Sequence, residues 1–403
     1  MISAKKFCEK IKDVKIGDIL AIFKLIIAYP LSKIVKLKHK DLWLICEDGV
    51  GACDNGYAFY KYIIKEHPEQ EVMYAIDKKS SDYNKVKDMG KIIQFGSLKH
   101  WIYYLAASQN ISSQKSGKPN AALCYVLEVG GLWKNSRIFL QHGITINDSK
   151  WIYYPETKFS LFLCGAQPEY DFVEGKFLYP RGYVQYTGFP RFDELHNVKV
   201  NKKRILVMPT WRNWLKLKSK NEGGKIPEFV ESTYYKYWND FLNNKELQDI
   251  LEEYDLELIF YPHRNMQQYI EFFKGYSKRI VIANKEKYDI QTLLKTSALM
   301  ITDYSSVFFD FFYMKKPIIF YQFDELEYRK NQLQVGWFDY ANNPISVRVT
   351  EEKDVIEALK MSIENKFEIS EHQYQAHRWC FPLYDMENSE RVFQTIKNDN
   401  YKI

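Results

Sequence analysis

Short apolar runs alternate with helical patterns along most of the chain. In the first half, β-branched and aromatic residues favour strands over 42–46, 72–76, 91–95, 110–113, 137–141 and 159–164. Helical periodicity lies between these runs, for instance over 57–67 and 98–107. Strands that alternate with helices are typical of parallel sheets built from β–α–β units, so the first half predicts an α/β domain.

A second series of the same kind follows a break in the pattern. Residues 196–203 (HNVKVNKK) are polar and basic without apolar periodicity, and we interpret them as an interdomain linker. Beyond them, strands are favoured over 204–208, 256–261, 279–282, 298–302 and 317–321, and helices over 229–253, 289–297 and 305–315. The 403 residues of the chain suit two domains of about 200 residues each.

The predicted fold class is therefore α/β, with two Rossmann-like domains over 41–196 and 204–403 that face each other across a cleft. The last helix is a candidate to return to the first domain. In such folds ligands bind at the carboxyl ends of the strands. The residues that directly follow each predicted strand are therefore candidates for the functional site.

The N-terminal segment 1–40 combines apolar residues with lysines. Its longest uncharged stretch, Leu25–Ser32, is far shorter than the roughly 20 residues that a spanning helix needs. An apolar face beside a lysine cluster favours insertion into an anionic membrane surface. The alternative is a helix packed on the protein's own core, with solvated lysines. The residues concerned are Ile19, Leu20, Phe23, Ile26, Ile27, Lys33, Lys36, Lys38 and Lys40.

Composition narrows the class of protein. With 46% hydrophobic and 27% charged residues the chain is globular, and a net charge of +6 is too small to predict a nucleic-acid binder. The six cysteines are scattered without metal-ligand spacing. Residues 1–15 carry charges of both signs and no apolar core, so we predict no signal peptide and a reducing, cytoplasmic compartment.

The segment ITDYSSVFFDF has the sharpest chemical signature. A strand ends at Thr302, and Asp303, Ser305 and Ser306 lead into an apolar helical pattern. The first amides of a helix are unpaired, so a helix that starts here with hydroxyl side chains could hold a diphosphate. The alternative is an ordinary helix cap.

Two histidines stand at similar places, each directly after a predicted strand. His142 is followed by Gly143, and His263 is followed by Arg264. Histidine serves as acid, base or phosphate partner near neutral pH, although a structural donor is the alternative for each. Arg212 follows the first strand of the second domain and suits a phosphate, with a surface ion pair as the alternative.

Taken together, the motifs resemble the CDP-glycerol glycerophosphotransferase family, whose members build teichoic-acid and related polyol-phosphate polymers. The matching segments, in family order, are CDNGYAFYKYI, QHG, TGFPRFD, MPTWR, FYPHR, ITDYSSVFFDF and YDMENSER. The resemblance implies a GT-B-like pair of Rossmann domains, with a CDP-activated polyol bound by the second. It also implies a peripheral location on the inner face of the membrane, and an acceptor that is a polyprenyl-diphosphate-linked saccharide or polymer.

The resemblance and the motif positions together assign candidate residues. The two motif histidines, His142 and His263, are the candidate catalytic residues. The donor-binding candidates are Arg212, Arg264, Thr302, Asp303, Ser305 and Ser306. The acceptor-side candidates are Asp54, Asn55, Gly56 and Gly143, and weaker candidates are Arg191, Ser389 and Arg391.

Two motifs depart from the family pattern. Asp385 is followed by Met386 and Glu387 where the family has Asp-Gly, and Asp48 and Cys53 stand where arginines are usual. The turn that carries Asp48 and Cys53 belongs to the first-domain region that should face the acceptor.

The expected reaction is attack of an acceptor hydroxyl on the β-phosphorus of a CDP-polyol, either CDP-glycerol or CDP-ribitol, with release of CMP. We expect no metal or cofactor, because the sequence shows no acidic cluster suited to Mg²⁺. One rival is a GT-B glycosyltransferase or epimerase that uses a nucleotide sugar. The other is a non-catalytic nucleotide-binding protein of the cell envelope.

Overall fold

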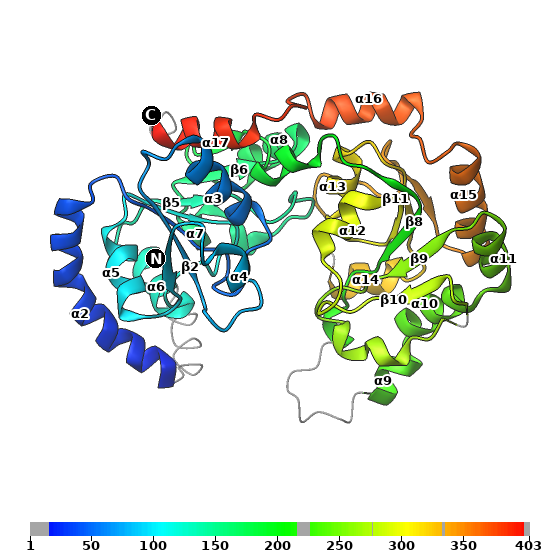
Figure 1. Cartoon of the computed structure of the whole chain (residues 1–403), viewed down its shortest axis with the longest axis horizontal. Helices are drawn as coiled ribbons and strands as arrows, with labels where there is room; N and C mark the ends of the chain where they lie inside the picture. Colours follow the sequence, from blue (N-terminus) through cyan, green and yellow to red (C-terminus); the bar gives the residue numbers. More distant parts are fainter. Residues whose placement is uncertain (1–15, 216–225, 276, 333–334, 399–403) are drawn as a thin grey trace. The chain divides into compact units, whose positions relative to one another are not determined.

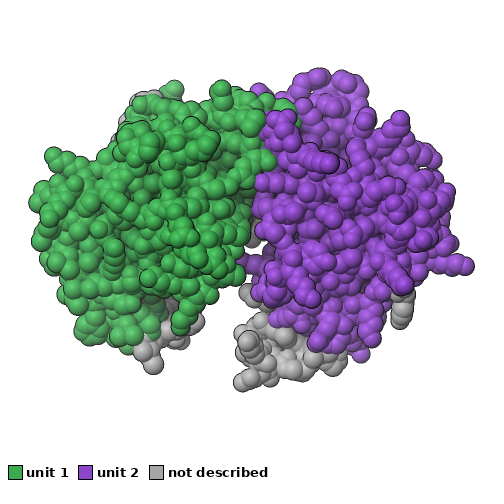
Figure 2. Space-filling model, viewed as in Figure 1, with its two compact units in different colours: residues 1–144, 149–194, 383–403 green, residues 145–148, 195–382 purple. Residues whose placement is uncertain are grey.

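The computed structural model describes residues 16–215, 226–275, 277–332 and 335–398. The chain forms two compact units, which Figure 2 colours separately. Unit 1 consists of residues 1–144, 149–194 and 383–403, and unit 2 of residues 145–148 and 195–382. Residues 1–15 of the predicted N-terminal segment lie outside the described residues.

Unit 1 is built on a seven-stranded parallel sheet with the order β3-β2-β1-β4-β5-β6-β7 (Figure 1). Its strands are β1 (Trp43–Ile45), β2 (Val72–Ile76), β3 (Lys91–Gln94), β4 (Gln109–Ser112), β5 (Arg137–Phe139), β6 (Leu161–Cys164) and β7 (Val184–Tyr186). The sequence predicted six of them and missed β7, a three-residue edge strand in which only Val184 is buried.

Alternate residues of β1 pack on opposite faces of this sheet, as the two-residue period of a strand requires. Trp43 and Ile45 share a core with α3 (Asn55–Glu66) and α17 (Asn388–Lys397), which lie beside each other. Leu44 shares the other core with α2 and α5. The remaining helices of unit 1 are α2 (Ile16–Lys38), α4 (Tyr83–Val86), α5 (Leu98–Ala106), α6 (Ala121–Val129), η1 (Lys150–Ile152), α7 (Tyr154–Thr157), α8 (Gln167–Lys176) and η2 (Pro190–Leu195).

Unit 2 contains a six-stranded parallel sheet with the order β10-β9-β8-β11-β12-β13. Counted from β8, this is the 3-2-1-4-5-6 order of dinucleotide-binding folds. The strands are β8 (Asn201–Met208), β9 (Glu257–Phe260), β10 (Ile280–Ile282), β11 (Ser297–Thr302), β12 (Ile318–Tyr321) and β13 (Val347–Val349). Strand β8 begins inside the expected linker, and β13 is a second short edge strand that the sequence did not predict.

The helices of unit 2 are shorter than predicted. The single helix expected over 229–253 is wrong, because Ser232 and Asn244 interrupt it and their side chains cap the helices that follow. The helix expected from residue 305 begins at Phe308. The helices are η3 (Asn213–Leu215), α9 (Ile226–Glu231), α10 (Thr233–Asn243), α11 (Lys245–Glu253), η5 (Gln267–Phe272), α12 (Ile290–Thr296), α13 (Phe308–Tyr313), α14 (Glu325–Asn331), α15 (Glu352–Glu364) and α16 (Glu371–Cys380).

Helix α2 continues through Pro30 and has two unlike faces. Ala21, Ala28 and Ser32 are buried on the side that packs against α5. Among the described residues, no helix is both long and apolar enough to span a bilayer. The other side of α2 exposes a row of large apolar side chains: Ile19, Leu20, Ile22, Phe23, Ile26, Ile27, Tyr29, Leu31, Ile34 and Leu37.

Candidate functional site

The candidate donor residues of unit 2 follow β8, β9 and β11. Strands β8 and β11 are neighbours, with Met208 paired to Thr302, and the strand order reverses between them. The loops that leave their carboxyl ends therefore lie side by side. In open α/β sheets this switch point is where ligands bind.

Arg212 ties these loops together from inside the protein. Its side chain has no exposed surface and donates to Asp303 Oδ2 at 2.9 Å and to Asp324 Oδ2 at 2.7 Å. It also donates to the Thr210 carbonyl at 2.8 Å. Burial alone lowers the pKa of Arg212, but the two carboxylates raise it, so the guanidinium stays charged.

The predicted direct contact of Arg212 with the donor does not agree with this burial. Three aromatic rings surround the guanidinium at 4.8–5.2 Å, namely Tyr234, Tyr304 and Tyr328. Asp303 is equally buried and accepts from the Thr210 and Tyr304 amides at 2.8 and 2.6 Å. The Thr302 hydroxyl donates to the Met208 carbonyl at 2.7 Å. These residues shape the loops.

Ser305, Ser306 and Arg264 reach the surface of the same region. The two serines are half-buried, and Arg264 is exposed in the loop after β9, the neighbour of β8. Ser305 Oγ accepts from the Val307 amide at 3.4 Å and does not cap α13, which starts at Phe308. Hydroxyl, amide and guanidinium donors are thus gathered at one edge of unit 2.

His263 lies against Trp211 in that region, with stacked rings whose centroids are 6.1 Å apart. Its Nδ1 accepts from the Asn265 amide at 3.2 Å. Burial, followed by the charge of Arg264, lowers the pKa of His263 to about 4. The ring is therefore neutral at pH 7, and an accepting Nδ1 leaves the proton on Nε2.

In unit 1 the corresponding helix end is already filled by Glu47, which follows β1. Its carboxyl group accepts from the amides of Cys53, Asp54 and Tyr57 at 2.9–3.2 Å, at the start of α3. Burial, then the nearby Asp54 carboxylate, raise the pKa of Glu47 to about 8. A side chain of the protein thus occupies the place where a nucleotide phosphate binds in Rossmann folds.

The glycines of the 47–56 turn make room for the Glu47 carboxyl group. A Cβ atom on Gly51 would lie 2.9 Å from Glu47 Oε2, and one on Gly56 would lie 2.9 Å from Glu47 Cγ. Gly56 is buried against Glu47, so its predicted place on the acceptor side does not agree with the structure. The turn serves internal packing.

Asn55 holds the turn that presents His142. It is fully buried, and its amide nitrogen donates to the carbonyls of Leu140 and Gln141 at 3.1 and 2.7 Å. Gln141 adopts a left-handed conformation (φ 58°), which is strained for a residue with a side chain. His142 follows it and is exposed, and Gly143 is half-buried. The structure thus assigns Asn55 to the support of the His142 turn.

The weaker candidates lie in or near the contacts that hold α17 against the rest of unit 1. Asp193 accepts from the amides of Asn388 and Ser389, each at 2.8 Å. The Arg391 guanidinium pairs with Asp385 at 2.8 Å and donates to the Thr187 carbonyl at 3.0 Å. On the same side of unit 1, Arg191 pairs with the half-buried Asp54 at 3.1 Å. The TGFPRFD and YDMENSER motifs therefore bind each other and have a structural role.

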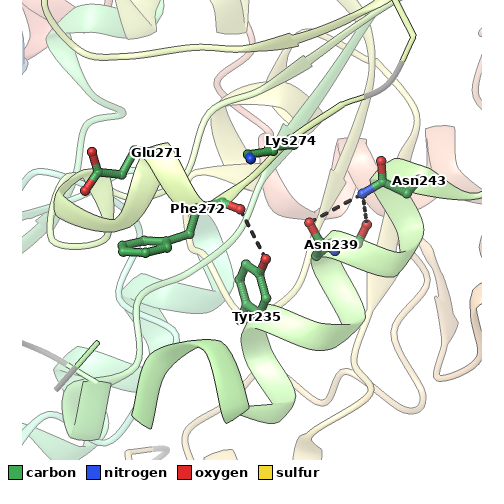
Figure 3. A pocket seen from close by; sticks show the side chains of 6 residues that line it. All are labelled: Tyr235, Asn239, Asn243, Glu271, Phe272 and Lys274. Atoms are coloured by element: carbon green, nitrogen blue, oxygen red, sulfur yellow. Dashed lines mark hydrogen bonds between the residues drawn. The ribbon is translucent and has the colours of Figure 1, made fainter. Parts of the chain in front are cut away.

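A pocket of about 540 Å³ lies elsewhere in unit 2, between α10 and the segment around η5. Figure 3 shows Tyr235 pointing to the backbone of Phe272, and Asn243 pointing to Asn239. None of the candidate residues lines this pocket. We therefore place the candidate site at the switch point.

Sequence reasoning missed three residues that position the candidate residues, namely Glu47, Asp193 and Asp324. Glu47 and Asp324 each follow a strand within three residues, which was the available signal. Asp193 stands inside a motif, but its partners lie 195 residues further along the chain. Within the described ranges, no group of three or more His, Cys, Asp and Glu side chains is arranged to hold a metal ion.

Comparison with solved structures confirms the predicted GT-B-like fold class. The wall teichoic acid polymerase TagF superposes with a TM-score of 0.65 at 17% identity, over 96% of this chain and 99% of that chain. A UDP-N-acetylglucosamine 2-epimerase from Listeria monocytogenes superposes with a TM-score of 0.56 at 14% identity, over 90% of this chain and 97% of that chain. Both are similar to this chain in fold.

Comparison of sequences places the chain in a family. It is 29% identical over 372 residues to the minor teichoic acid biosynthesis protein GgaB of Bacillus subtilis, covering 91% of this chain but only 41% of that protein. Residues 27–398 match the family described as CDP-Glycerol:Poly(glycerophosphate) glycerophosphotransferase. Since this match runs through both units and includes every candidate residue, the chain belongs to the CDP-glycerol:poly(glycerophosphate) glycerophosphotransferase family.

Proposed function

We propose that this protein transfers glycerol phosphate from CDP-glycerol to a hydroxyl of a lipid-linked saccharide or polymer, in teichoic-acid-type synthesis. Family membership supports the donor class. One structural observation supports binding of the donor by unit 2: the helix end of unit 1 that could take a nucleotide phosphate is filled by Glu47. At the switch point of unit 2, Ser305 and Ser306 remain half-buried.

In the proposed reaction, the acceptor oxygen forms a bond to the β-phosphorus of the donor while the bond to the CMP oxygen breaks. His142 is exposed and takes the proton of the attacking hydroxyl. His263 is neutral, so it contributes an Nε2–H hydrogen bond to the transferring phosphate, and Arg264 contributes the positive charge. CMP leaves with the electron pair of the broken bond.

Buried residues position these groups. Arg212 and Asp303 join the loop after β11, which carries Ser305 and Ser306, to the loops after β8 and β12. Ser305 and Ser306 hold the cytidylyl phosphate through their hydroxyls and the neighbouring amides. Asn55 holds the turn of His142. Catalysis of phosphoryl transfer depends mostly on such placement and on charge stabilisation.

We further propose that α2 places the enzyme on the inner face of the membrane, where a lipid-linked acceptor would lie. Its outer face exposes ten large apolar side chains over one helix, including Phe23 at 61% and Ile26 at 63%. Lys33, Lys36, Lys38 and Lys40 are exposed at its carboxyl end. Apolar residues with adjacent lysines match an anionic headgroup layer.

The donor screen tests this function against the nucleotide-sugar rival. The purified protein is incubated with a short-chain diphosphate-linked acceptor and with CDP-glycerol, CDP-ribitol or UDP-N-acetylglucosamine. We expect release of CMP from CDP-glycerol alone or most rapidly, and a matching glycerol phosphate on the acceptor by mass spectrometry. Release of UDP or an epimerised sugar would favour the rival enzyme. Tight binding without turnover of any donor would favour a nucleotide-binding protein.

A further inference from the structure

Unit 1 carries an aromatic and cationic cluster that the proposed mechanism does not use, formed by Lys115, Tyr125 and Trp151. The Lys115 ammonium lies 5.2 Å from the centre of the Tyr125 ring and 5.9 Å from that of Trp151. It also donates to the Trp151 carbonyl at 2.7 Å. The Trp151 side chain is 50% exposed, although indole is one of the most costly surfaces to leave in water.

Lys115 lies on the loop after β4, and Trp151 lies in η1 on the connection after β5. Tyr125 lies on α6 and is buried, with its hydroxyl donating to Glu156 Oε2 at 2.7 Å. Ser112 pairs with Phe139 in neighbouring strands, so Lys115 and His142 each stand three residues beyond the same register position. The Leu140 amide donates to the Ser112 carbonyl at 2.9 Å, which keeps the two chains together where they leave the sheet. Trp151 belongs to the same β5–β6 connection as His142.

The loop of Lys115 also leads to α2. Asn120, which follows that loop and caps α6, donates to Asp18 of α2 at 2.7 Å. Buried pairs anchor the loop from below, since Lys118 pairs with Glu128 at 2.6 Å and Arg137 donates to the Lys115 carbonyl at 3.3 Å. A continuous path of contacts therefore runs from the apolar helix, through the Lys115 loop, to the strand end of His142.

We propose that Lys115 and Trp151 of this cluster form a subsite for a phosphorylated pyranose of the acceptor. The apolar face of a sugar ring stacks on an exposed indole, and the ammonium group pairs with a phosphate. A chain of glycerol phosphate alone has no ring that could stack on Trp151. This inference rests on the proposed function and specifies it, because it makes the acceptor a ring-containing saccharide phosphate.

The binding test does not depend on turnover. Saturation-transfer difference NMR is recorded with N-acetylglucosamine 1-phosphate and with glycerol 3-phosphate as the ring-free probe. We expect strong transfer to the pyranose protons with the unaltered protein and with Trp379→Ala, whose indole is 54% exposed in unit 2. Transfer should disappear in Trp151→Ala and be retained in Trp151→Phe. Equal transfer in Trp151→Ala would overturn the subsite, as would equal binding of glycerol 3-phosphate.

Kinetics separate this inference from the function on which it rests. With a short-chain diphosphate-linked N-acetylglucosamine as acceptor, Trp151→Ala and Lys115→Met should each raise the acceptor KM at least fivefold. The KM for CDP-glycerol should stay within about twofold. Absence of CMP release by the unaltered protein would reject the proposed function, whereas an unchanged acceptor KM in both variants would reject only the subsite.

Discussion

His263 shows how burial decides what a side chain contributes. The sequence predicted its place after a strand, but not the stacking of its ring on Trp211, which leaves it half-buried. Burial and the charge of Arg264 lower its pKa to about 4. The candidate phosphate partner is therefore a neutral hydrogen-bond donor and not a cation. Its partners lie in other loops, so local sequence could not have revealed this change.

Thermal stability at mildly acidic pH tests the neutral state of His263. In the unfolded chain the ring takes up its proton near pH 6.5. Between about pH 6.5 and 4 the unfolded state therefore binds more protons, and native stability falls as the pH falls. We expect His263→Asn to lose less melting temperature than the unaltered protein between pH 7 and pH 5 in scanning calorimetry. His142→Asn is the control, because His142 is exposed. Identical pH dependence of both variants would contradict a His263 ring that is neutral in the folded protein.

The support of His142 by Asn55 predicts coupling between the two residues. Asn55→Leu removes both hydrogen bonds to the carbonyls before His142, so kcat should fall at least tenfold while the KM for CDP-glycerol changes little. In a His142→Ala background, the same change should have no further effect on kcat. Asn110→Leu is a matched control, since Asn110 is also buried and donates to a backbone carbonyl of unit 1. Additive losses would mean that Asn55 acts apart from His142.

At the scale of elements, the sequence predicted every central strand and missed only β7 and β13. Most central strands are buried and appear as apolar runs, although β4 has the polar sequence QNIS. The two missed strands are three-residue edge strands with a polar residue at the centre, VQY and VRV, whereas the predicted edge strand β10 is wholly apolar. The break of one predicted helix at Ser232 and Asn244 depends on capping bonds, which compete with helix continuation in a way that apolar periodicity does not show.

Three loops of unit 2 depend on one buried cation, which makes Arg212→Lys a sharp test. An ammonium group cannot reach both Asp303 and Asp324 in the geometry of a guanidinium, so one buried carboxylate loses its partner. We expect a loss of about 3 kcal/mol or more in the free energy of unfolding, measured by urea titration. Arg279→Lys, at an exposed pair with Glu252, should change stability little. Similar effects of the two changes would argue against the positioning role of Arg212.

At the scale of the whole molecule, α2 combines the two alternatives that the sequence left open for residues 16–40, namely packing on the protein's own core and an exposed apolar face. Its small residues pack on α5, and its large apolar residues face outward. The sequence could not decide between core and surface because both faces are apolar. The side with the small residues is the buried one because α5 packs against it, and the position of α5 is a property of the fold that local sequence does not show.

Binding to vesicles tests the outward face. Changing Lys33, Lys36, Lys38 and Lys40 to Glu should abolish co-sedimentation with anionic liposomes, because each lysine near such a surface contributes about 1 kcal/mol. Changing Lys65, Lys78, Lys79 and Lys87 to Glu alters the net charge equally at exposed positions of unit 1 outside α2, and should leave binding largely intact. Binding of the unaltered protein should weaken as salt rises. Loss of binding in both variants alike would indicate a general charge effect.

The return of residues 383–403 to unit 1 has a consequence for folding of the protein during its synthesis on the ribosome. Val392, Phe393 and Ile396 complete the core around β1, and Asp193 gains its partners only when Asn388 and Ser389 arrive. Unit 2 has all its residues once position 382 has emerged. The unit that is encoded first is therefore the last to be finished, and during synthesis its open core depends on a helix that has not yet been translated.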